Sequence, residues 1–70
     1  MTVREICEQL GLNASMLARA ADIDVRSARK AWDQTGEISD RVKRQIAEAL
    51  SRKTGQTILV GEIEWTSGNT

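Results

Sequence analysis

The sequence predicts an all-α domain built as a small bundle of four to five helices. The chain has 70 residues, of which 40% are hydrophobic. A chain of this length buries only about 60% of its unfolded surface, so it supports one core. Apolar residues recur at helical spacing in four segments, each bounded by residues that start or stop helices. We therefore expect a single domain over residues 1–65, with residues 66–70 as a flexible tail.

The first two helices are expected on either side of Gly11, a residue that readily ends a helix. Thr2 and Glu5 have the spacing of a capping box, in which each side chain accepts a hydrogen bond from the other residue's backbone N–H. The apolar positions of this helix are Val3, Ile6, Cys7 and Leu10. Asn13 is a good N-cap for a short second helix. The apolar positions of the second helix are Met16, Leu17, Ala18 and Ala21.

The third and fourth helices follow after short connections. Asp24 is expected to cap the third helix, residues 25–33, with its carboxylate. The buried stripe of that helix is Ala28, Ala31 and Trp32. The third helix ends before the pair Thr35-Gly36. The fourth helix is capped by Ser39 at its start and ends before the pair Thr54-Gly55. The apolar face of the fourth helix comprises Ile38, Val42, Ile46, Ala49 and Leu50.

The segment from residue 56 to residue 65 is too apolar to be a free tail. A short strand at 57–60 and a final helical turn at 61–65 both fit, because periodicity does not discriminate over so few residues. The apolar side chains either pack on the body of the same chain or form the surface of a homodimer. The side chains expected at such a dimer surface are Ile58, Val60, Ile63 and Trp65.

Composition argues against several classes of protein. Cys7 is the only cysteine and the chain has no histidine, which excludes an internal disulfide and a Cys/His zinc site. Cys7 is expected to be a small core residue. With no histidine base and no catalytic motif, we expect neither an enzyme nor a metal, cofactor or small-molecule site. The chain has neither a long apolar run nor a signal-peptide pattern, so we expect no membrane association and a cytoplasmic location.

The formal net charge is zero, but charge is unevenly distributed. All ten basic residues lie within residues 1–53, against eight acidic ones, and the remaining acids are Glu62 and Glu64. The third helix carries three basic residues and no acid between positions 25 and 32, namely Arg26, Arg29 and Lys30. The fourth helix carries Arg41, Lys43, Arg44, Arg52 and Lys53. Two segments are therefore locally cationic, as nucleic-acid binding requires.

Residues 17–32 have the pattern of two short helices joined by a tight turn. The small Ala18 permits close approach of the helices, while Ile23, Ala28 and Ala31 fill the angle between them. This segment resembles the helix-turn-helix of the Cro and lambda-repressor-like regulators and, less closely, that of the LacI family. The matching residues are Leu17-Ala18, Ile23, Ala28, Ala31 and, in the following helix, Ile38-Ser39 and 46–50. The resemblance covers about residues 2–53.

Two positions depart from the family pattern. Asp22 stands in the turn where the family usually has glycine, and Ala28 stands where it usually has a larger aliphatic residue. Aspartate tolerates a left-handed backbone better than most residues, so the turn is expected to form at some cost in strain. Trp32 is expected to fill the space beside Ala28.

The resemblance implies a lambda-repressor-like helix-turn-helix bundle whose third helix enters the major groove of double-stranded DNA. The outward residues expected to read bases are Val25, Arg26, Ser27, Arg29 and Lys30, with Arg26 as the first candidate for a bidentate contact to guanine. The residues expected to contact phosphates are Asn13, Ser15, Thr35 and Arg41. The implied function is that of a prokaryotic transcriptional regulator or repressor, with homodimers suiting a palindromic site.

Other interpretations stay open at this point. The basic residues of the third helix also fit a solvated helix face, and Arg52 and Lys53 fit a favourable interaction with the dipole of their own helix. A helical protein-interaction module that uses its apolar C-terminal segment is the alternative function. A basic patch on the third helix would favour DNA, and an exposed patch of Ile58, Ile63 and Trp65 would favour a protein partner.

Overall fold

The structure of the protein is a computed structural model, which describes residues 1–65. It contains four α-helices and one 3-10 turn, namely α1 (Val3–Leu10), α2 (Ala14–Ala21), α3 (Val25–Asp33), α4 (Asp40–Thr54) and η1 (Val60–Glu62). The only β pairing among these residues is an isolated parallel bridge between Thr2 and Glu64. The prediction of a small all-α fold is therefore confirmed. No helix in the described range has the length and apolar character that would let it cross a membrane.

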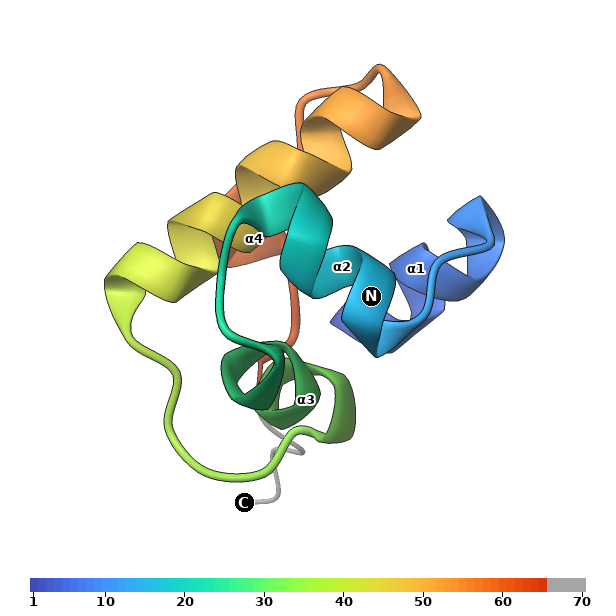
Figure 1. The fold of residues 1–70 in the computed structure, drawn as a ribbon. Helices are drawn as coiled ribbons and strands as arrows, with labels where there is room; N and C mark the ends of the chain where they lie inside the picture. Colours follow the sequence, from blue (N-terminus) through green and yellow to red (C-terminus); the bar gives the residue numbers. More distant parts are fainter. Residues whose placement is uncertain (66–70) are drawn as a thin grey trace.

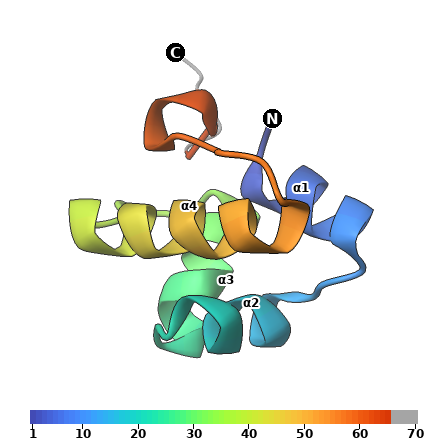
Figure 2. The ribbon, with the colours of Figure 1, turned by 90° about the horizontal axis from the view of Figure 1, so that it is seen from above.

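Seen from above relative to Figure 1, α4 lies between the C-terminal segment, residues 56–65, on one side and α2 and α3 on the other (Figure 2). Helix α2 packs against both α3 and α4, and α1 packs against the same two helices. The C-terminal segment lies on the far side of α4 from α2, as the view from above shows (Figure 2). The outer surface of α2 is therefore not covered by the C-terminal segment, whereas Glu64 O accepts a hydrogen bond at 3.3 Å from Gln34 Nε2, just after α3.

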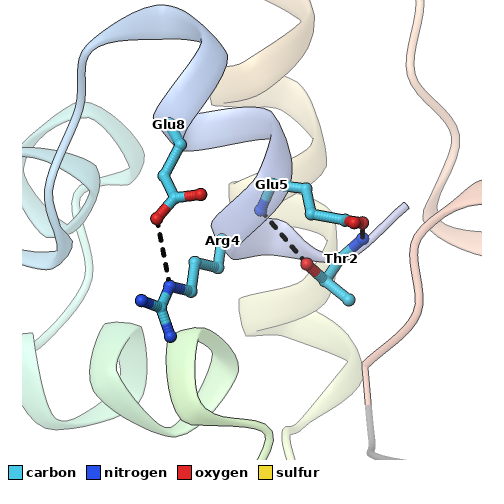
Figure 3. A network of polar contacts seen from close by, with 4 residues as sticks. All are labelled: Thr2, Arg4, Glu5 and Glu8. Atoms are coloured by element: carbon cyan, nitrogen blue, oxygen red, sulfur yellow. Dashed lines mark hydrogen bonds and ion pairs between the residues drawn. The ribbon is translucent and has the colours of Figure 1, made fainter.

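Local capping interactions define the ends of the helices as expected. At the start of α1, the Thr2 backbone N–H donates to Glu5 Oε1 at 2.8 Å, and the Glu5 N–H donates to Thr2 Oγ1 at 3.1 Å (Figure 3). Asn13 Oδ1 accepts from the Met16 N–H at 2.8 Å, and Ser39 caps α4 in the same way. These contacts join residues three positions apart, which is why the sequence alone predicts them.

Two expectations about side chains were wrong. Asp24 occupies the N-cap position of α3, but its carboxylate makes no capping hydrogen bond. Its effect on α3 is therefore limited to the attraction between its charge and the helix dipole. Met16 is 46% exposed rather than buried, because the core-facing side of α2 is occupied by Leu17, Ala18 and Ala21 and Met16 lies on the other side.

All four helices contribute to one hydrophobic core. Its largest fully buried side chains are Val3, Cys7, Leu17, Ile46 and Leu50. Cys7 is a core residue, as expected, and burial raises the pKa of its thiol to about 11. Trp32 is half-buried and packs against the core, so the third helix contributes a smaller buried stripe than predicted, formed by Ala28 and Ala31.

The C-terminal segment forms no strand at 57–60, and the helical turn that the sequence left open at 61–65 appears as the shorter 3-10 turn η1 at Val60–Glu62. Partners elsewhere in the chain satisfy its backbone: Ser51 Oγ accepts from the Ile58 N–H at 2.8 Å, and Met1 O accepts from the Glu64 N–H at 2.8 Å. Ile63 and Trp65 are 4% and 9% exposed and belong to the core of the same chain. The expected tail, residues 66–70, lies outside the described residues.

Candidate nucleic-acid interface

The turn between α2 and α3 depends on the left-handed conformation of Asp22. Its φ and ψ are 56° and 49°, the region that favours glycine. Because the backbone reverses there, the Asp22 N–H donates to Arg19 O at 3.2 Å and the Ile23 N–H donates to Ala18 O at 2.9 Å. Ile23 then packs against the core. Asp22 thus performs the backbone role for which glycine is usual, and α3 begins only three residues later, at Val25.

Small side chains let α2 and α3 pack closely. Ala18 and Ala21 on α2 are 3% and 4% exposed, and Ala28 and Ala31 on α3 are fully buried. With only methyl groups between them, the two helix backbones approach more closely than larger aliphatic residues would permit. Figure 1 shows α3 below α2, with the connection from α3 to α4 curving around it.

The outward side of α3 is basic. Arg26, Arg29 and Lys30 are all exposed, and within residues 1–65 none of the three forms an ion pair or a side-chain hydrogen bond. Arg4 provides the contrast, because its guanidinium pairs with Glu8 at 3.1 Å (Figure 3). Within α3 the one acid is Asp33, two helical turns after Arg26, and the exposed Asp24 lies at the N-cap of the helix. The face therefore carries a net positive charge that is available to a ligand.

Val25 and Ser27 border this basic face differently. Val25 is 42% exposed, so its methyl groups are accessible beside Arg26. Ser27 is half-buried and, with Ser39 and Val42, lines two shallow hollows between α3 and the start of α4. Ser27 precedes the fully buried Ala31 by one turn, which turns it toward α4. The structure thus groups Val25 with the outward cations and places Ser27 at the edge of the face.

The four residues expected at phosphates lie at helix ends. Asn13 precedes α2, and its amide nitrogen stays free because the capping bond uses Oδ1. Ser15 is exposed in the first turn of α2, and Thr35 is exposed just after α3. Arg41 is exposed in the first turn of α4 and lines the same hollow as Ser27 and the α2–α3 turn. The structure therefore brings Arg41 next to α3, while no described contact joins it to Asn13 or Ser15.

Two basic residues of α4 take part in the fold instead. Arg52 Nη2 donates to Ala20 O at 3.1 Å, so it binds a carbonyl in the last turn of α2 rather than acting only on its own helix. Lys43 Nζ lies 5.9 Å from the centre of the Trp65 ring, a cation–π contact. Neither role was predicted, since each partner is remote in the sequence.

No other chemistry is assembled in the part of the chain that the structure describes. Residues 1–65 contain no group of three or more His, Cys, Asp or Glu side chains placed to hold a metal ion. Comparison with known proteins found no matching family model, no matching curated protein and no matching solved structure. The interface is therefore defined by the chain's own residues and geometry.

Proposed function

We propose that the protein binds double-stranded DNA sequence-specifically, with α3 in the major groove, and acts as a cytoplasmic prokaryotic transcriptional regulator or repressor of the lambda-repressor-like helix-turn-helix type. The observation that carries this proposal is the unpaired basic face of α3 on a helix that a three-residue turn holds against α2. Helix α3 has nine residues and is about 13 Å long. The major groove of B-DNA is about 12 Å wide, which is enough to admit an α-helix.

Arg26 is the principal base-reading residue in this proposal. It lies in the first turn of α3, on the side opposite the buried Ala28 and Ala31, so it is at the centre of the outward face. Its fork of donors matches O6 and N7 of guanine. Val25 is suited to a thymine methyl, and Arg29 and Lys30 to a base or a phosphate. Ser27, half-buried at the edge, is suited to a base edge only at close approach.

Phosphate contacts on either side of the groove would set the position of α3. Asn13 and Ser15 lie at the N-terminus of α2, and Arg41 lies at the N-terminus of α4, where free backbone N–H groups favour anions. Thr35 lies two residues after the last residue of α3. Such contacts fix the register of the protein on DNA without reading sequence.

The zero net charge is compatible with DNA binding because part of the acidic charge lies on other elements, while Asp22, Asp24 and Asp33 border the basic face of α3. Glu62 and Glu64 belong to the C-terminal segment, which lies across α4 from α2 (Figure 2). Glu8 is paired with Arg4 on α1. The alternative of a protein-interaction module based on the C-terminal segment is weakened, since Ile63 and Trp65 are buried in the chain's own core.

The test is selection from a randomised duplex DNA pool at low and physiological salt, followed by sequencing of the retained fraction. We expect one enriched motif, and a palindrome with half-sites one helical turn apart if the protein binds as a dimer. With Arg29, Lys30 and Arg41 on phosphates, the slope of log K against log salt should be about −3. No retention at low salt would refute DNA binding, and retention without enrichment would refute sequence-specific reading.

A further inference from the structure

Asp24 is an exposed acid at the N-terminus of α3, the helix proposed to read DNA. Its carboxylate makes no capping bond, and it forms no hydrogen bond or ion pair with any residue from 1 to 65. The other α-helices differ, because Thr2, Asn13 and Ser39 each accept a hydrogen bond from a backbone N–H of the helix they cap. Both oxygens of the Asp24 carboxylate are therefore left unused by the described part of the chain.

The position of Asp24 places this carboxylate within the candidate interface. It precedes Arg26, the proposed guanine reader, by two residues, and the N-terminal residues of a recognition helix are those that contact base edges. Asp24 also lines one hollow together with Ser27 and Arg41, at the border of the basic face of α3. Asp33 lies at the opposite end of the helix. A duplex that received Arg26 in its major groove would therefore also receive the Asp24 carboxylate.

A carboxylate that enters the major groove needs a hydrogen-bond donor, because it loses water there and is repelled by the phosphates. The bases present two kinds of donor in this groove, the N4 amino group of cytosine and the N6 amino group of adenine. The adenine amino group lies between two acceptors that repel an anion, N7 of the same base and O4 of the paired thymine. The cytosine amino group has one such neighbour, O6 of the paired guanine. Cytosine is therefore the base that best accommodates Asp24.

We propose that Asp24 is a further specificity-determining residue, which accepts a hydrogen bond from the N4 amino group of a cytosine in the DNA site. This inference rests on the proposed function, since it assigns a base to one more side chain of the same interface. Two residues of backbone span at most about 7 Å, or about two base-pair steps, so the cytosine is expected close to the guanine read by Arg26. At other sequences the carboxylate meets acceptors or phosphates, so Asp24 also rejects DNA that the basic residues of α3 alone would bind.

Selection from the randomised duplex pool with the wild-type chain and with Asp24→Ala tests this inference. The wild-type chain should enrich a motif containing a cytosine that Asp24→Ala no longer prefers, while the guanine assigned to Arg26 stays enriched with both. In fluorescence anisotropy, replacing that cytosine should cost the wild-type chain at least about tenfold in affinity and Asp24→Ala almost nothing. Asp24→Ala should bind the substituted duplex more tightly than the wild-type chain does, because it lacks the repulsive charge.

Two further variants separate the loss of an acceptor from the loss of a charge. Asp24→Asn keeps the size of the side chain and a residue type that is favoured at N-caps, so α3 should begin as before. Its amide both donates and accepts, which suits N7 and N6 of adenine, so the preference should shift from cytosine to adenine. Asp33→Asn is the matched control, since it removes the same charge from the exposed last residue of α3 and should affect all duplexes about equally. Circular dichroism verifies that all three variants keep their helices.

Failure of this inference is distinguishable from failure of the proposed function. If the wild-type chain enriches a motif and both Asp24 variants keep every preference in it, the role of Asp24 is refuted while sequence-specific DNA binding is not. A gain in affinity that is equal on all duplexes, as expected for Asp33→Asn, would also refute it, because Asp24 would then act only as a repulsive charge. If the wild-type chain enriches no motif, both proposals are refuted.

Discussion

Arg26→Ala is the substitution that most directly tests the proposed reading of DNA. Arg26 is exposed and has no partner among residues 1–65, so its removal should change the free energy of unfolding by no more than about 0.5 kcal/mol. A change in DNA affinity therefore reports the contact with DNA and not a loss of folded protein.

The expected magnitude follows from the type of contact. A bidentate pair between arginine and guanine contributes about 1–3 kcal/mol of discrimination, so affinity for the selected site should fall about 5- to 150-fold. Affinity for a duplex in which that guanine is replaced should change little, because the wild-type chain already lacks the contact there. The preference at one base pair should therefore disappear while preferences elsewhere in the site remain.

Fluorescence anisotropy with the selected duplex and its single-base variants measures both quantities. Lys53→Ala is the matched control, since it removes one exposed positive charge from the last turn of α4, at the end remote from α3 (Figure 1). A uniform loss for Arg26→Ala on all duplexes, with the salt slope reduced by about 1, would assign Arg26 to a phosphate. An unchanged selected-site profile would refute its assignment as the reader.

Four further predictions follow from single contacts. Arg41→Ala should weaken binding to all duplexes about equally and reduce the salt slope by about 1, and a sequence-dependent loss in anisotropy would contradict its phosphate role. Asp22→Gly should relieve the strain of the left-handed backbone and raise the melting temperature by a few degrees, since 1 kcal/mol of stability shifts the melting temperature of a chain this size by about 4–8 °C. Asp22→Ala should lower the melting temperature. An increase for both variants would show that the carboxylate charge, and not the backbone, is destabilising. Thr2→Ala should destabilise the fold by about 1 kcal/mol in urea unfolding through loss of the α1 cap, and an unchanged midpoint would show that the capping box is not stabilising. Burial raises the pKa of the Cys7 thiol from 9.0 to about 11, so the thiol of the unfolded chain ionises at lower pH than that of the folded chain. The free energy of unfolding should therefore fall as the pH rises between these two values. Cys7→Ala should lack this contribution to the pH dependence in urea unfolding.

The helix ends were predictable because they depend on residues three to five positions apart. The Thr2–Glu5 capping box, the caps at Asn13 and Ser39 and the stop at Gly11 all appear in the structure as the sequence indicates. The exception is Asp24, where residue type predicted a capping bond that the backbone geometry does not form. A short polar residue before a helix shows where a cap belongs, but the bond also needs the right side-chain orientation.

The candidate site was predictable to the extent that helical periodicity defines the faces of α3. The positions of the buried Ala28 and Ala31 imply that Arg26 points outward, and in the structure it is exposed. Ser27 was less accurately predicted, because a position at the border of a face is buried or exposed according to the neighbouring element. Here that element is the start of α4.

The sequence by itself determined the four helices, the caps that begin α1, α2 and α4, and the basic outer side of α3, since all of these follow from residues within two turns of one another. Tertiary structure decided the placement of the C-terminal segment, where Ser51 binds the backbone of Ile58 seven residues away. It also decided the role of Arg52, whose carbonyl partner on Ala20 is 32 residues away. Such contacts depend on how helices pack, and packing is a property of the whole core that no local pattern encodes.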